Sequence, residues 1–117
     1  MKADEVRPQK WLWHANYPIR ILYDDSEYSV IWGKYENTKA LGVRWNGGKD
    51  VGFPNQGGYS TWYVEPDFIA ISILQRLLTI AMDKDNDREY LDNINFAIQE
   101  LTNQMETEQP DHKSKTV

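Results

Sequence analysis

The chain has 117 residues, of which 40% are hydrophobic and 26% charged, a composition typical of one globular domain. It contains no cysteine, which excludes disulfides, thiolate metal ligands and a cysteine nucleophile. Its formal net charge of −5 disfavours nucleic acid as a partner, because phosphate backbones are contacted by clusters of Lys and Arg.

Both ends of the chain are polar and predict disorder outside one folded unit. Residues 1–10 carry charges of both signs and no apolar stretch, so we expect a flexible lead-in and no secretory signal. Residues 11–105 form the predicted domain, and residues 106–117, which contain Pro110, form a predicted disordered tail. No apolar run approaches the ~20 residues that span a bilayer. We therefore expect a cytoplasmic protein without membrane contact.

Three segments ahead of Pro66 have the alternating pattern of β-strands, and a fourth is rich in the Thr, Trp, Tyr and Val that strands favour. They cover residues 19–24, 27–35, 41–46 and 60–65. In the first of them, strict alternation places Ile19, Ile21 and Tyr23 on one face. The connections between the segments are too short for the crossovers that parallel strands need. We therefore predict an antiparallel meander.

Two helices are predicted after the strands, over residues 66–82 and 87–105. Pro66 suits a first helical turn, and the polar stripe of this first helix is narrow. Such a helix is either covered on two sides or part of a subunit interface. Asn86 is a good N-cap for the second helix, and Glu89 follows at capping-box spacing. The predicted fold class is α+β: an antiparallel sheet of about four strands, followed by two C-terminal helices packed on one face.

The segment between the helices resembles the opening of an EF-hand calcium loop. Asp83, Asp85 and Asp87 have the required spacing. However, Arg88 stands where the loop needs glycine at its sixth position, and Ile94 where it needs a bidentate carboxylate. We therefore interpret the segment as an acidic linker that caps helices, and we predict neither a metal site nor a cofactor.

Few residues are suited to catalysis. His14 stands among apolar neighbours, and His112 falls in the predicted tail. The sequence has no G-x-S-x-G elbow, and the glycines of residues 47–50 lack the spacing of a P-loop. Asp24 and Asp25 fall in an expected hairpin turn, which is the commonest position for such residues. We therefore predict that the protein is not an enzyme.

The stretch from residue 44 to residue 62 is the strongest candidate for a binding site. It combines glycine-rich turns with aromatic and amide side chains, a mixture that suits a ligand pocket or a protein hot spot. The candidate contact residues are Arg44, Trp45, Asn55, Gln56, Tyr59 and Trp62. In the alternative interpretation, the glycines only shape turns and the aromatic residues complete a small core.

Three runs in the chain resemble short bacterial proteins without an assigned activity, some of which are carried on mobile elements such as integron cassettes. The runs are Leu41–Gly47, Gly52–Pro54 and Trp62–Pro66, and the resemblance covers residues 19–78. Because those proteins have no established activity, the resemblance implies a bacterial origin and no particular function.

Three functions therefore stay open. The first is a small binding module that contacts a protein or small ligand through the aromatic, glycine-rich stretch. The second is an acidic inhibitor or immunity-type protein that neutralises a basic partner, because the chain from Pro66 onward has ten acidic and five basic residues. Its surface would include Asp83, Asp85, Asp87 and Asp92. The third is a small enzyme in which Arg44, a tyrosine and a carboxylate share a pocket. A homodimer through the first helix or an open sheet edge is a further expectation.

Overall fold

The computed structural model describes residues 2–13, 16–83 and 88–116, with side chains described as far as Thr107. Its main sheet consists of β1 (Arg20–Asp24), β2 (Tyr28–Tyr35), β3 (Thr38–Trp45) and β6 (Tyr63–Glu65). All neighbours in the order β1-β2-β3-β6 are antiparallel. A small hairpin of β4 (Asn55–Gln56) and β5 (Tyr59–Ser60) lies apart from it. The predicted fold class is thereby confirmed.

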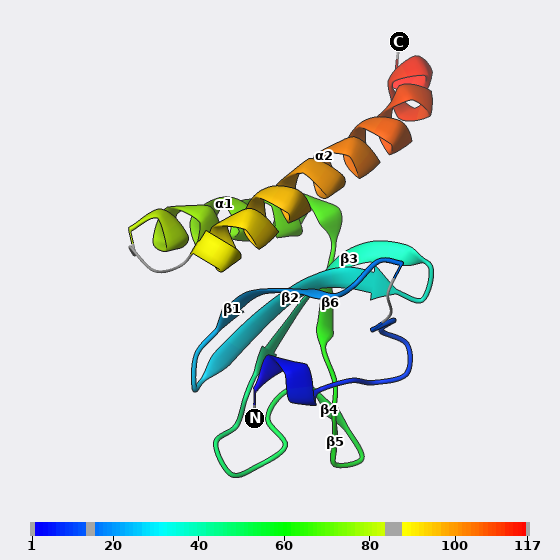
Figure 1. The fold of residues 1–117 in the computed structure, drawn as a ribbon. Coiled ribbons are helices and arrows are strands. Elements are labelled where there is room, and N and C mark those ends of the chain that lie inside the picture. Colours follow the sequence, from blue (N-terminus) through cyan, green and yellow to red (C-terminus); the bar gives the residue numbers. More distant parts are fainter. Residues whose placement is uncertain (1, 14–15, 84–87, 117) are drawn as a thin grey trace.

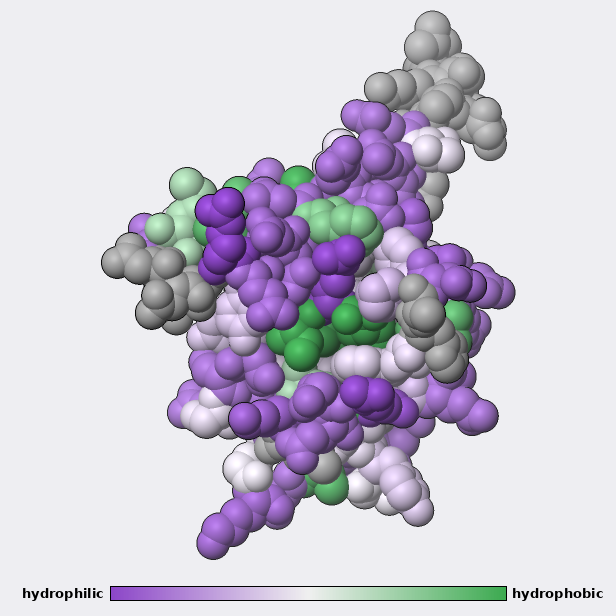
Figure 2. Space-filling model, viewed as in Figure 1, coloured by the Kyte–Doolittle hydropathy of each residue, from purple (hydrophilic) through white to green (hydrophobic). Residues whose placement is uncertain are grey.

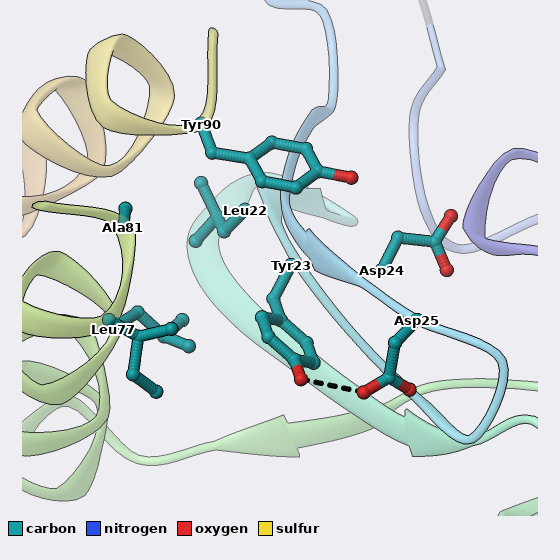
Figure 3. A pocket seen from close by; sticks show the side chains of 8 residues that line it. Leu22, Tyr23, Asp24, Asp25, Leu77, Ala81 and Tyr90 are labelled. Atoms are coloured by element: carbon teal, nitrogen blue, oxygen red, sulfur yellow. Dashed lines mark hydrogen bonds between the residues drawn. The ribbon is translucent and has the colours of Figure 1, made fainter. Parts of the chain in front are cut away.

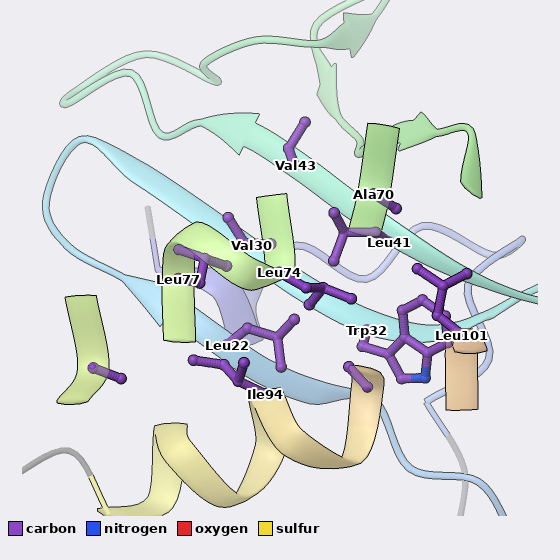
Figure 4. Close-up of a cluster of buried hydrophobic side chains, with 12 residues drawn as sticks. Leu22, Val30, Trp32, Leu41, Val43, Ala70, Leu74, Leu77, Ile94 and Leu101 are labelled. Atoms are coloured by element: carbon purple, nitrogen blue, oxygen red, sulfur yellow. The ribbon is translucent and has the colours of Figure 1, made fainter. Parts of the chain in front are cut away.

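Two helices cover one face of this sheet (Figure 1). They are α1 (Asp67–Met82), which begins directly after β6, and α2 (Arg88–Thr116). Between the two layers lies a core of buried side chains from both, drawn in Figure 4. The sheet contributes Leu22, Val30, Trp32, Leu41 and Val43 to this core, and α1 and α2 contribute Ala70, Leu74, Leu77, Ala81, Ile94, Ala97 and Leu101. No helix in the described part of the chain is long and apolar enough to cross a membrane.

A second buried cluster lies on the opposite face of the sheet. The short helix η1 (Ala3–Glu5) and the segment after it supply Ala3, Val6 and Trp11, which pack with Ile31, Ala40 and Trp62. Main-chain hydrogen bonds from Leu12 N to Lys34 O (3.0 Å) and from Glu36 N to Lys10 O (2.6 Å) fix the segment to β2 and to the turn that follows it. Ala3 and Val6 are fully buried, so the structure packs this segment against the sheet, where the sequence predicted a flexible lead-in over residues 1–10.

One irregularity in β1 overturns the predicted alternation of its side chains. The register with β2 shifts between Ile21 and Tyr23, as at a β-bulge. Ile19 and Ile21 therefore pack in the second cluster, whereas Leu22 and Tyr23 both belong to the core under the helices. A bulge inserts one residue and reverses the faces that follow, which strict alternation does not anticipate.

The apolar surface of α1 is wider than the core under it. Ala70, Leu74, Leu77 and Ala81 are buried between the sheet and α2. Phe68 keeps 71% of its surface exposed, and Ile69 keeps 39%. On the side seen in Figure 2, most of the coloured surface over α2 is hydrophilic, and hydrophobic residues show in a band between the helix layer and the sheet. The helix is thus covered on two sides, as one of the two alternatives predicted, while the homodimer stays a prediction.

The bounds of α2 differ from those predicted. The proposed N-cap Asn86 lies outside the described residues, and the described helix starts at Arg88. At its other end, α2 does not stop at Met105 but continues to Thr116, past Pro110. The disorder expected of residues 106–117 stays a prediction.

Candidate functional site

The strongest candidate site is a groove of about 220 Å³ at the end of β3. Its lining consists of Tyr28, Val43, Arg44, Trp45, Phe53, Pro54 and Tyr63, and we call it the aromatic groove. Trp45 and Tyr63 are each 58% exposed and Phe53 is 69% exposed, although all three are large apolar side chains. Such a concentration of exposed aromatic surface on one groove is the usual sign of a binding site.

The rings are placed by backbone pairing. Trp45 N donates to Phe53 O over 2.7 Å, and Phe53 N donates to Trp45 O over 2.9 Å, which sets these two residues side by side. In the β2–β3 register, Tyr28 stands directly opposite Trp45. Their ring centroids are 4.7 Å apart with planes at 70°. The groove is therefore anchored on a hydrogen-bonded ladder and does not depend on a free loop.

Arg44 supports the groove from behind. Strand alternation separates its side chain from those of Val43 and Trp45. It is 1% exposed, and its guanidinium donates to the carbonyl oxygens of Val51, Thr61 (2.5 Å) and Pro54 (3.3 Å). Among the described residues it forms no ion pair, and its Nε has no partner. Loss of hydration lowers its pKa. Arg44 thus holds the loop segments together through their carbonyls, and the several N–H donors of its planar guanidinium suit this role.

Trp62 also has a structural position. It is 4% exposed in the second buried cluster, with the Cζ of Arg44 lying 5.9 Å from its ring. Its neighbour Tyr63 points to the other face of the sheet, where the groove lies. For Trp62 and Arg44, the core-and-turn interpretation of the sequence describes the geometry better than direct ligand contact does.

A second hollow, of about 380 Å³, adjoins the groove. Trp45 and Phe53 line both hollows, and Asn55 lines the second one together with Asp50 and residues 47, 51 and 52. Asn55 Nδ2 donates to Gly52 O over 3.1 Å, which ties the β4–β5 hairpin to the loop before it. Asn55 is therefore beside the groove and not in it.

The remaining candidates lie away from the groove. Gln56 and Tyr59 belong to the exposed β4–β5 hairpin and line neither hollow, although Tyr59 is 80% exposed. The candidate contact residues did not include Tyr28, Phe53 and Tyr63, which also line the groove. Two of these could have been found: Tyr28 lies opposite Trp45 once the hairpin register is known, and Tyr63 is the outward neighbour of a buried Trp.

Asp24, at the end of β1, and Asp25, in the turn after it, line another hollow of about 280 Å³ together with Tyr23 and Tyr90 (Figure 3). Asp25 Oδ1 accepts hydrogen bonds from Glu27 N and Tyr28 N, each 2.7 Å long, and its Oδ2 accepts one from Tyr23 Oη over 2.6 Å. The last contact raises the pKa of Tyr23.

Asp24 is also engaged in structural contacts. It accepts hydrogen bonds from Ser29 Oγ over 2.6 Å and from Ala3 N over 3.2 Å. Behind it, buried Asn46 donates to Ser29 Oγ and to Asp25 O over 2.9 and 3.0 Å. The pair of carboxylates therefore shapes the turn and holds the N-terminal segment, which matches the interpretation of these residues as turn formers.

The alternative acidic surface is described only in part. Asp83 and Asp92 are exposed, whereas Asp85 and Asp87 lie outside the described residues. His14 lies outside them too, and the side chain of His112 is not among those described. No cluster of His, Asp and Glu that could hold a metal ion occurs in the described ranges.

Comparison of the chain with protein-family models, with curated proteins and with solved structures found no match.

Proposed function

We propose that the protein is a small, non-enzymatic binding module whose binding site is the aromatic groove. The observation that carries the proposal is the exposure of Trp45, Phe53 and Tyr63 around one hollow that is fixed by paired backbone. Because these rings are exposed in the free protein, a ligand that covers them buries their apolar surface, and this burial favours binding. A preformed site also avoids the entropic cost of ordering a loop on binding.

The geometry gives little support to the enzyme alternative. That alternative needs Arg44 to face a substrate together with a tyrosine and a carboxylate. Arg44 is instead 1% exposed and donates to three main-chain carbonyls. The groove lining contains no carboxylate. A binding role needs none of these groups to be reactive, so it fits the groove better.

The function can be tested with small organic probes added to the intact protein. We would titrate phenol, isopropanol, tetramethylammonium and acetate separately and follow amide and indole signals by NMR. The proposal predicts saturable shifts of Trp45, Phe53 and Tyr63 with at least one probe. Phe53→Ala should abolish them, whereas Tyr59→Ala, which removes an exposed ring outside the groove, should leave them unchanged. If no probe shifts the groove signals, the binding role is wrong.

The inhibitor function and a bacterial origin on a mobile element stay predictions. Exposed Asp83 and Asp92 are compatible with the former. The homodimer is likewise compatible with exposed Phe68 and Ile69 on α1 and with the position of β6 at the edge of the sheet. None of these features forms a shaped site like the aromatic groove, which is why we place the binding role there.

A further inference from the structure

The lining of the aromatic groove contains four aromatic rings. Tyr28 and Trp45 pack edge to face with ring planes at 70°, and Phe53 and Tyr63 add two further rings. The face of an aromatic ring carries partial negative charge, and it attracts a cation within about 6 Å of its centre, most strongly when the ring is Trp or Tyr. Several rings around one hollow form the arrangement by which proteins recognise quaternary ammonium groups.

The protein places its own cations on other rings. Arg20 lies 3.8 Å from the ring of Phe96, Arg7 lies 4.5 Å from that of Trp13, and Lys39 lies 5.2 Å from that of Tyr17. No described Lys or Arg side chain has such a contact with the four rings of the groove. These rings are therefore available to a cation from outside.

The overall charge of the protein favours a cation. Burial is the first cause that raises the pKa of Tyr28, and the negative charge of Glu65 on β6 is the second, although Glu65 is not among the residues that line the groove. The protein as a whole carries a net charge of −5. The opposing charge is that of Arg44, but its guanidinium is 1% exposed and donates to loop carbonyls behind the groove. A cation in the groove thus meets the ring faces, while the charge of Arg44 is engaged by loop carbonyls.

Size and surroundings indicate what kind of molecule carries the cation. The groove volume of about 220 Å³ is below the roughly 300–1,000 Å³ of pockets for drug-sized ligands, so it fits one small head group. The acidic chain is repelled by anionic membrane surfaces. The edge strand β6 has only three residues, which offers a peptide little backbone pairing. A small free solute is favoured over a lipid or a peptide.

Building on the binding role proposed above, we propose that the groove binds a small free solute with an alkylated ammonium group, of the choline type. The methyl groups of such a cation contact the apolar ring faces, while its charge interacts with the rings. A primary ammonium is less suited, because it is strongly hydrated and the groove lining offers few acceptors for its three donors.

Two probes of the same shape separate charge recognition from apolar binding. Choline and its neutral carbon analogue 3,3-dimethylbutan-1-ol would be titrated against the whole chain, with NMR shifts of Trp45 and Phe53 as the readout. We expect choline to bind about tenfold more tightly than the neutral analogue, the size of effect that cation–π contacts produce.

Two variants and two further ligands serve as controls for choline binding. Phe53→Ala should reduce choline binding at an unchanged urea midpoint, and Tyr59→Ala should bind choline like the parent. Equal affinity for both probes overturns the cation proposal and leaves the groove as an apolar binding site. Binding of phosphatidylcholine vesicles or of a trimethyllysine peptide without binding of free choline also overturns it. If choline fails while phenol or isopropanol binds, only the cation proposal is wrong; if no probe binds, the binding role fails as well.

Discussion

The indole Nε1 of Trp62 donates a buried hydrogen bond of 2.8 Å to the main-chain carbonyl of Val6. This contact joins the last part of the β half to the N-terminal segment, 56 positions earlier in the chain. It closes the second core, on the sheet face that the helices leave uncovered. The N-terminal residues are therefore part of the folded domain, and the aromatic groove is built on a sheet that is covered on both faces.

Removal of residues 1–10 should destabilise the domain. The truncation exposes Trp62 and removes Ala3 and Val6 from the second core. Burial of one Val side chain contributes about 1.5–3 kcal/mol, so we expect a loss of at least about 2 kcal/mol in the free energy of unfolding. Urea unfolding followed by tryptophan fluorescence would measure it. An unchanged urea midpoint would mean that the segment is not docked in solution.

Trp62→Phe should cost about 1–3 kcal/mol, because the Val6 carbonyl loses its donor, whereas exposed Trp45→Phe should cost little.

Replacement of Arg44 should destabilise the protein and distort the groove. Arg44→Met leaves the carbonyl of Thr61 without its guanidinium donor, whereas the carbonyl of Val51 keeps the hydroxyl of Ser60 as a donor. An unsatisfied buried group costs about 1–3 kcal/mol, so we expect the free energy of unfolding to fall by about that amount, together with shifted NMR signals of Phe53. Arg76→Met on the exposed side of α1 is the matched control and should have little effect. Equal midpoints for the two variants would contradict the supporting role of Arg44.

Substitutions at two glycines with positive φ distinguish the cost of a steric clash from the cost of backbone strain. Gly52 (φ +75°) has no room for a Cβ, which would meet the main chain at Trp45 and the side chain of Arg44. Gly48 (φ +57°) has nothing within 4 Å of that position. Gly48→Ala should therefore cost only the strain of positive φ, about 1–2 kcal/mol. Gly52→Ala should cost clearly more and disturb the Trp45–Phe53 pairing. Similar urea midpoints for the two variants would show that the loop relaxes around the added methyl group.

The pH dependence of stability should reflect the contact between Tyr17 and Glu100, whose Oε1 accepts a hydrogen bond from the Tyr17 hydroxyl over 2.7 Å. The hydrogen bond from Lys39 is the main cause that lowers the pKa of Glu100, and the one from Tyr17 is the second. Because this carboxyl titrates lower in the folded protein, its stabilisation is present above its ordinary pKa of 4.5 and is lost as the pH falls through the lowered value.

The pH dependence of stability that comes from the Tyr17 phenol has the opposite sign to that from the Glu100 carboxyl. Burial is the main cause that raises the pKa of Tyr17 above its ordinary 10.0, so its stabilisation is present below pH 10.0 and is lost as the pH rises further. Urea midpoints across the pH range would test both arms. The difference between the parent and Glu100→Gln should shrink on the acid side, and that between the parent and Tyr17→Phe on the basic side. Glu106→Gln, at an exposed position of α2, should follow the parent throughout. Differences that do not vary with pH would contradict the role of this pair.

The sequence by itself determined the fold class, because two periodicities are visible in it. Alternation in residues 27–35 predicted β2, and Val30 and Trp32 do face the helices while Ile31 faces away. The helical spacing after Pro66 predicted α1 within one residue of its bounds. Both patterns are local, and each follows from the need of an element to bury one face.

Only the tertiary structure decided which aromatic residues are core and which form the groove. Trp45 and Trp62 are equivalent in the sequence, yet Trp62 is 4% exposed under the N-terminal segment and Trp45 is 58% exposed. The difference depends on the docking of residues far away in the chain, such as Val6, and on the bridge between Trp45 and Phe53. In the same way, Arg44 resembles a ligand contact until its three carbonyl partners are known. Burial is a property of what packs on a residue, and that information is not local to the residue itself.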